Sequence, residues 1–267
     1  PPSMSAPIAP AAIADSMIIV SPTFYPSLDD TRCELGLQAC KCAADAGIRL
    51  LLVDASPPDV HAALTATGVL VRKQTAKGRK GAALREAIGA ALELLPPDGV
   101  ICYQELEKVG MISLQSSVAD ALRASPAADV CVPRRDDGLF RTSYPVEQYH
   151  SEHFANAYLD ALAKAVGFPS IDWTFGPLAF RTAVARHWLD CTGELWDAQI
   201  VPMVAAARWH GAGVVVHTVA YAHPAEMKAE EEGGAAWSVK RLEQLNFLFA
   251  HVGGALKADR PPSGGVV

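Results

Sequence analysis

A segment rich in glycine and lysine, KGRKGAALREA at 77–87, is the most informative stretch of the chain for chemistry. It stands directly before a predicted amphipathic helix. Free backbone N–H groups, the positive end of the helix dipole and the side chains of Arg79 and Lys80 can therefore converge on a phosphate. The segment lacks the GxxxxGK[ST] pattern of Walker-type ATPases, and no GxGxxG motif of nicotinamide enzymes follows the first predicted strand. We predict a phosphate site here; the alternative is a solvated basic loop that caps the helix.

Two glutamates occur in the string QELEK, directly after the fourth predicted strand. Side chains at positions i and i+2 of an extended segment point the same way, so Glu105 and Glu107 present two carboxylates to one place. A divalent cation that bridges a diphosphate needs such a pair. The alternative is an ordinary polar strand end, in which Glu107 and Lys108 lie in water.

Three further side chains have two interpretations each. Glu194 and Asp197 flank a predicted helix start, where a carboxylate either favours the helix dipole or acts as a base. His223 follows an alternating strand segment and is either a metal ligand or a hydrogen-bonded surface residue. The acidic run at 230–232 is predicted to be a solvated, mobile segment.

The elements that must position these residues follow a regular rhythm of apolar runs and helical patterns. Predicted strands cover residues 16–21, 48–54, 69–72, 100–103 and 130–133. Continuous apolar strands separated by amphipathic helices predict βαβ crossovers, and hence an α/β fold with a mostly parallel central sheet and helices on both faces. Ligands gather beyond the carboxyl ends of such strands, where the candidate residues lie.

The second half of the chain departs from this rhythm. A long helix around residues 154–166 leads to the string DWTFGPLAFR at 172–181. A helix at 200–209 and an alternating strand at 214–221 follow. We predict one domain at 16–256 with an elaborated C-terminal half, a linker-like segment at 1–15 and a flexible tail at 257–267.

Composition excludes several classes of protein. Of the 267 residues 50% are hydrophobic and 19% are charged, which excludes a largely disordered chain. The net charge of −6 argues against a nucleic-acid-binding protein with a broad basic face. No run approaches 18 apolar residues and no signal peptide is visible, so no transmembrane segment is expected. The cysteines lie mostly in apolar patterns and are predicted to be reduced core thiols, which favours a soluble, cytoplasmic protein.

Taken in order, these motifs resemble the GT-A glycosyltransferases, the nucleotide-diphospho-sugar transferase superfamily, over about residues 16–225. The opening strand followed by Pro22-Thr23 is similar to the first nucleotide-contacting turn of that family, and the segment at 77–88 is similar to its basic phosphate-approaching segment. The resemblance implies a nucleotide site formed by Pro22, Thr23, Asp54, Arg79, Lys80, Gln104, Glu105, Lys108 and Gly176.

The resemblance also implies a catalytic carboxylate and a metal. Asp197 falls where the acidic catalytic motif of the family lies, with Glu194 as the alternative. QELEK takes the place of the DxD metal motif, so Glu105, Glu107 and His223 are the implied ligands of Mn²⁺ or Mg²⁺. Because longer glutamates replace aspartates and Lys108 adds a positive charge, we predict weak metal binding and only partial dependence of activity on metal.

The implied activity is transfer of a sugar from a nucleoside diphosphate sugar to an acceptor hydroxyl. The implied partners are that donor and a carbohydrate or small-molecule acceptor, with no nucleic acid. One alternative is a sugar-1-phosphate nucleotidyltransferase, which would place a glycine- and arginine-rich loop after the first strand, where this chain has SPTFYPSLDD. Another is a non-catalytic nucleotide-sugar-binding domain of a larger polypeptide.

Overall fold

A computed structural model describes residues 16–259. The linker-like segment predicted at 1–15, and residues 260–267 of the predicted tail, lie outside the described residues. Within the described part of the chain, no helix is both long enough and apolar enough to cross a membrane.

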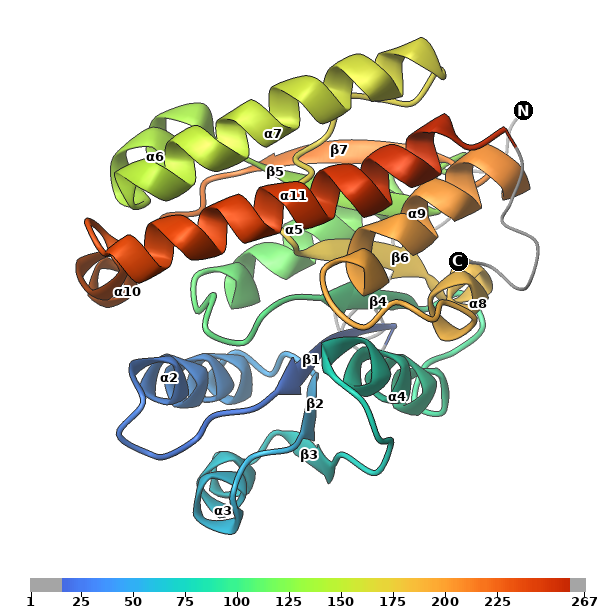
Figure 1. Ribbon diagram of the computed structural model, residues 1–267. Helices are drawn as coiled ribbons and strands as arrows, with labels where there is room; N and C mark the ends of the chain where they lie inside the picture. Colours follow the sequence, from blue (N-terminus) through green and yellow to red (C-terminus); the bar gives the residue numbers. More distant parts are fainter. Residues whose placement is uncertain (1–15, 260–267) are drawn as a thin grey trace.

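Seven strands form one mixed sheet in the order β3-β2-β1-β4-β6-β5-β7 (Figure 1). The strands are β1 (Met17–Thr23), β2 (Leu50–Asp54), β3 (Leu70–Lys73), β4 (Val100–Tyr103), β5 (Val130–Arg135), β6 (Leu178–Arg181) and β7 (Val214–Val219). All neighbouring pairs are parallel except those of β6, which runs antiparallel to both β4 and β5. The prediction of an α/β fold with a mostly parallel sheet is confirmed. β6 lies inside the string DWTFGPLAFR, which was not predicted as a strand; only Leu178, Ala179 and Phe180 of its four residues are apolar.

Local sequence signals mark the start of α2 and the end of α9. Asp30 caps α2 by accepting hydrogen bonds from the N–H groups of Arg32 and Cys33. Gly211 ends α9 with a φ of +73°, which a residue with a side chain adopts only under strain. The helices are α2 (Thr31–Asp45), α3 (Pro58–Ala66), α4 (Lys80–Leu92), α5 (Met111–Arg123), α6 (Asp137–Ser143), α7 (Val146–Ala165), α8 (Arg186–Leu189), α9 (Asp197–His210), α10 (Ala225–Glu231) and α11 (Ala235–Lys257).

Alternate residues of the strands supply two separate cores, one on each face of the sheet. Ile18 and Val20 of β1 pack with side chains of α4, α7, α8, α9 and α11. Met17 and Ile19 pack with side chains of α2, α3 and α5 on the opposite face. α11 runs along α7 and α9, so the end of the chain completes the first layer (Figure 1). The sheet is therefore covered on both faces, as its continuous apolar strands require.

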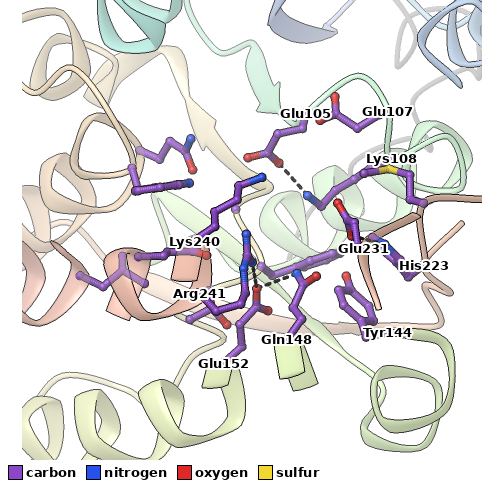
Figure 2. A pocket seen from close by; sticks show the side chains of 18 of the residues that line it. Glu105, Glu107, Lys108, Tyr144, Gln148, Glu152, His223, Glu231, Lys240 and Arg241 are labelled. Atoms are coloured by element: carbon purple, nitrogen blue, oxygen red, sulfur yellow. Dashed lines mark hydrogen bonds and ion pairs between the residues drawn. The ribbon is translucent and has the colours of Figure 1, made fainter. Parts of the chain in front are cut away.

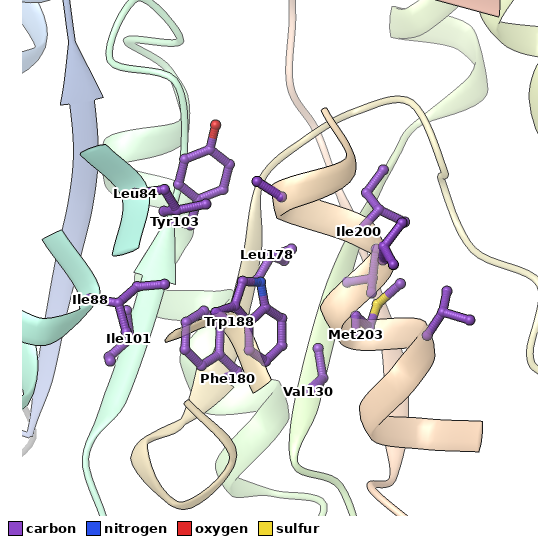
Figure 3. Close-up of a cluster of buried hydrophobic side chains, with 14 of the residues drawn as sticks. Leu84, Ile88, Ile101, Tyr103, Val130, Leu178, Phe180, Trp188, Ile200 and Met203 are labelled. Carbon is purple, nitrogen blue, oxygen red and sulfur yellow. The ribbon is translucent and has the colours of Figure 1, made fainter. Parts of the chain in front are cut away.

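An aromatic stack joins β6 to the helical layer (Figure 3). The rings of Phe180 and Trp188 lie 4.0 Å apart and nearly parallel, at 8°. The Trp188 indole N–H donates a 3.0 Å hydrogen bond to the backbone oxygen of Gln199 in α9. Trp188 therefore connects β6, α8 and α9, which carry one side of the candidate site.

We expect Trp188→Ala to lower the free energy of unfolding by about 4 kcal/mol, because it empties a well-packed core position and removes the indole hydrogen bond. Guanidinium chloride denaturation followed by circular dichroism measures the change. Leu242→Ala is the matched control, since Leu242 is 66% exposed and its truncation should cost less than about 0.5 kcal/mol. Equal effects of the two substitutions would contradict this account of the core.

Candidate functional site

Two cavities open at the carboxyl ends of the parallel strands. We call the first the β1 cavity; it has a volume of about 420 Å³ and is lined by residues that follow β1, β2 and β3 and begin α4. The second, the α11 cavity, has a volume of about 320 Å³ and is lined on one side by α11 (Figure 2). Four charged residues line both cavities: Arg32, Lys80, Glu105 and Glu107. A charged strip therefore connects the two cavities.

The β1 cavity contains five of the residues predicted to bind a nucleotide, namely Pro22, Thr23, Arg79, Lys80 and Glu105. Asp54 is fully buried and does not line this cavity, whereas the next residue, Ala55, does. The Asp54 carboxylate accepts hydrogen bonds from the hydroxyl groups of Thr23 (2.8 Å) and Ser56 (2.6 Å). Its other oxygen lies 2.8 Å from Nδ1 of His61. Asp54 thus positions Thr23, and its predicted contact with a base or ribose would need these bonds to change.

The N-terminus of α4 is occupied by a carboxylate of the protein itself. Glu194 accepts a 2.6 Å hydrogen bond from the Arg79 N–H and also contacts the guanidinium group of Arg85. Arg85 donates further hydrogen bonds to the carbonyl oxygens of Cys191 (2.9 Å) and Gly193 (2.7 Å). These bonds clamp the segment at 191–194 onto α4. The phosphate predicted at this helix would therefore contact the side chains of Arg79 and Lys80 and not the N–H group that Glu194 occupies.

Gly81 is required by this docking. A β-carbon at position 81 would lie 2.0 Å from the backbone oxygen of Gly193. The Gly81 N–H donates a 3.2 Å hydrogen bond to the backbone oxygen of Glu194. The second glycine of KGRKG thus permits close packing of two backbones, whereas the sequence suggested a role in binding phosphate.

The Glu105 carboxylate lies between two ammonium groups on the charged strip. Lys80 Nζ is 2.9 Å from Oε1, and Lys108 Nζ is 3.1 Å from Oε2. Burial by itself would raise the pKa of Glu105, but the charges of Lys108 and Lys80 outweigh burial and hold it well below its ordinary value. Gly176, with a φ of +97°, lets the chain pass close by, because a β-carbon there would lie 2.9 Å from this carboxylate.

The three predicted metal ligands do not form a metal site. Both oxygens of Glu105 are bonded to lysines, and Glu107 is paired with Arg32, whose Nε lies 3.1 Å from Oε1. His223 Nε2 lies 3.3 Å from a Glu231 oxygen (Figure 2). Among residues 16–259, no group of three histidine, cysteine or carboxylate side chains is arranged to hold a metal ion. Lysine and arginine have taken the places of a cation around these carboxylates, so the donor set does not fit Mn²⁺ or Mg²⁺.

The two predicted catalytic carboxylates and Gln104 form hydrogen bonds within the protein. Asp197 lines neither cavity and accepts a 2.9 Å hydrogen bond from the Leu195 N–H at the start of α9. Glu194 caps α4 as described above. Gln104 is buried and accepts a 3.2 Å hydrogen bond from the Gln115 side chain. The catalytic roles of Asp197 and Glu194 stay predictions.

Sequence reasoning missed the polar wall that α11 contributes to the α11 cavity. Lys240 and Arg241 extend from this helix into the cavity (Figure 2). The signal was present, since Trp237, Lys240, Arg241 and Gln244 have the i, i+3, i+4, i+7 spacing of one helix face. In the adjacent acidic run Glu230 and Glu232 are exposed, as predicted, and Glu232 accepts a 3.1 Å hydrogen bond from the Val146 N–H. Glu231 is partly buried and lines the cavity.

Cations outnumber carboxylates in the α11 cavity, although the whole chain is acidic. Its lining holds six lysines and arginines against four glutamates. Arg135 and Arg241 both contact Glu152, at 2.6 and 3.2 Å. Lys240 lies 4.5 Å from the centre of the Trp237 ring and forms no ion pair with any carboxylate of residues 16–259. Burial and the nearby guanidinium groups of Arg241 and Arg32 lower the pKa of Lys240.

Several buried polar atoms of the same cavity have no hydrogen-bond partner among the described residues. They are Gln148 Oε1, Gln199 Nε2, Tyr221 Oη, Trp237 Nε1 and Arg241 Nε. Buried polar groups are normally paired, because an unmade hydrogen bond costs about 1–3 kcal/mol. The residues that carry these atoms all line the α11 cavity, so its wall is rich in hydrogen-bonding side chains.

We expect Gly81→Ala to lower the free energy of unfolding by about 2 kcal/mol, because its β-carbon collides with the Gly193 carbonyl. Gly89 is the matched control in the same helix, since a β-carbon there meets no atom within 4 Å. Gly89→Ala should stabilise the protein by up to about 1 kcal/mol through helix propensity. Urea denaturation measures both, and substitutions of equal sign would contradict the docking of 191–194 onto α4.

No protein-family model matches the sequence, and no curated protein matches it. The structure is similar to that of glucosyl-3-phosphoglycerate synthase from Mycobacterium tuberculosis, with a TM-score of 0.57 and 13% identity over 91% of this chain and 82% of the other. The complex of that enzyme with Mn²⁺, UDP-glucose and phosphoglyceric acid gives a TM-score of 0.57 and 13% identity, over 94% and 86% of the two chains. Its complex with Mg²⁺ and UDP gives 0.54 and 13%, over 93% and 85%. With this similarity and its strand order, the chain has the GT-A fold of the nucleotide-sugar glycosyltransferases.

Proposed function

We propose that the protein transfers a sugar from a uridine diphosphate sugar to a hydroxyl group of a small anionic acceptor. The observation that carries this proposal is the charged strip of Arg32, Lys80, Glu105 and Glu107, where the β1 cavity meets the α11 cavity. A nucleotide sugar has parts in the matching order: a nucleoside, a charged diphosphate and a sugar. The β1 cavity would hold the nucleoside, the strip the diphosphate, and the α11 cavity the sugar and acceptor.

The lining of the β1 cavity supports a nucleoside there. The Phe24 ring is 62% exposed and offers a face on which a base can stack. The Thr23 hydroxyl donates to Asp54, so its oxygen can still accept a hydrogen bond from the ligand. Arg79 stands beside Lys80, which reaches the strip, and both can bind phosphate oxygens. Uracil is the proposed base because UDP and UDP-glucose are bound in the similar structures.

The excess of cations in the α11 cavity supports an acceptor with a carboxylate or phosphate group. Lys240 has no carboxylate partner among the described side chains and faces two arginines, so a bound anion would relieve repulsion among the three cations. Phosphoglyceric acid is bound in a similar structure. Polar side chains of the cavity wall, such as Gln148 and Gln199, would bind hydroxyl groups of the sugar and the acceptor.

The transfer exchanges one bond for another at the anomeric carbon of the sugar. The bond from this carbon to the diphosphate oxygen breaks, and its electron pair leaves with the nucleoside diphosphate. The acceptor oxygen bonds to the same carbon, and its proton is released to solvent. Negative charge develops on the leaving diphosphate, so cations fixed at the strip lower the barrier by stabilising that charge.

UDP should stabilise the protein in a thermal unfolding experiment. At 100 times its Kd a ligand adds about 2.7 kcal/mol, which is a shift of several degrees for a chain of this size. Uridine, which lacks the diphosphate, should give a much smaller shift. Arg79→Met should weaken UDP about tenfold by removing a charged hydrogen bond to phosphate. No shift with UDP, or equal shifts with UDP and uridine, would refute the proposed donor site.

Phosphoglycerate should be a better acceptor than glycerol in an assay of UDP release from UDP-glucose. Lys240→Met should raise the KM for phosphoglycerate about tenfold and leave the Kd of UDP within twofold, because Lys240 meets the acceptor only. Lys257→Met is the matched control on α11, since Lys257 lines neither cavity. Equal use of glycerol and phosphoglycerate by the wild type would exclude an anionic acceptor.

A further inference from the structure

The charged strip and the neighbouring Lys108 together carry a net positive charge at the position where GT-A enzymes are expected to hold a metal. Glu105 is bonded to both Lys80 and Lys108, which leaves one net positive charge on this group of three. Glu107 and Arg32 form a neutral pair. Arg79, which lines the neighbouring β1 cavity, adds a further positive charge. A site made of a divalent ion and two carboxylates would have no net charge. The strip with Lys108 has a positive net charge, so it is at least as attractive to a diphosphate as that metal site would be.

The two lysines are held in place and remain open to a ligand. Lys80 begins α4, whose position is set by the docking of 191–194. The Lys108 N–H donates a 3.1 Å hydrogen bond to the Glu105 carbonyl, and its ammonium group lies 5.9 Å from the centre of the Phe175 ring. The lysine side chains are 28% and 19% exposed, so each can meet a phosphate oxygen without leaving Glu105. Such preorganised cations need little rearrangement when the ligand binds.

Both oxygens of the Glu105 carboxylate are occupied, since Lys108 Nζ lies 3.1 Å from one and Lys80 Nζ lies 2.9 Å from the other. A divalent cation at Glu105 would have to displace one or both ammonium groups and would then be repelled by them.

We propose that Lys80 and Lys108, fixed on either side of Glu105, replace the divalent metal and bind the diphosphate of the donor directly, so that donor binding needs no metal ion. This inference rests on the proposed function, since it assigns the diphosphate of a nucleotide sugar to the strip. Glu105 acts as a positioning residue that holds one ammonium group at each of its two carboxylate oxygens.

Isothermal titration of the full chain with UDP, in EDTA and then in Mn²⁺, tests the proposal. The wild-type Kd should agree within twofold between the two conditions. In EDTA, Lys80→Met and Lys108→Met should each weaken UDP at least tenfold, whereas Lys80→Arg, which keeps the charge, should bind within about threefold of wild type. Lys77→Met is the matched control, because Lys77 lies in the same basic segment but lines neither cavity.

The double substitution Lys80→Met/Lys108→Met gives a second, independent readout. It frees both oxygens of Glu105, so Mn²⁺ should now bind and partly restore UDP affinity. Paramagnetic resonance of free Mn²⁺ measures this, and the wild type should bind none. If UDP binds the wild type only with Mn²⁺, the lysines do not replace the metal, although the proposed function stands. If UDP binds in neither condition, both proposals fail; the wild-type comparison holds even if a variant does not fold.

Discussion

The site depends on how one partly buried carboxylate is neutralised. Glu105 follows β4 at the meeting point of two cavities, where a lone negative charge would be costly and would repel a diphosphate. Lys80 from α4 and Lys108 from the next turn neutralise it, and Gly176 lets the segment before β6 approach it closely. Three separate segments must therefore be in place before the strip has its charge and shape.

The docking of 191–194 onto α4 supplies one of these conditions. Arg85 and Glu194 bond this segment to the helix, and Gly81 removes the β-carbon that would hold it away. The arrangement links α4, which lines the β1 cavity, to the half of the fold that carries α9. Because Glu194 accepts from N–H groups at the start of α4, the proposed diphosphate would bind to side chains there.

The α11 cavity shows how an acidic chain can present a cationic site. The net charge of −6 is spread over the whole chain, whereas the cavity gathers six cations from separate elements, among them α2, α4, β5 and α11. Several of these cations pair with carboxylates and become fixed in orientation, as Arg135 does with Glu152 and Asp172. Lys240, without such a partner in the described chain, is the cation that the proposed anionic acceptor would meet.

The sequence alone determined the fold class and the edge of the sheet that carries the site, because these follow from apolar periodicity and from the polar residues after each strand. The same reasoning identified Thr23, Arg79, Lys80, Glu105 and Lys108, which the structure places along the cavities. It did not reveal β6, a four-residue strand whose pairing is entirely non-local. It also could not decide what each charge contacts: Glu194 meets Arg79 115 residues away, and Glu105 meets Lys80 25 residues away. The local spacing of apolar residues determines where helices and strands form. Only the packing of distant segments decides which group a buried charge contacts, and hence its chemistry.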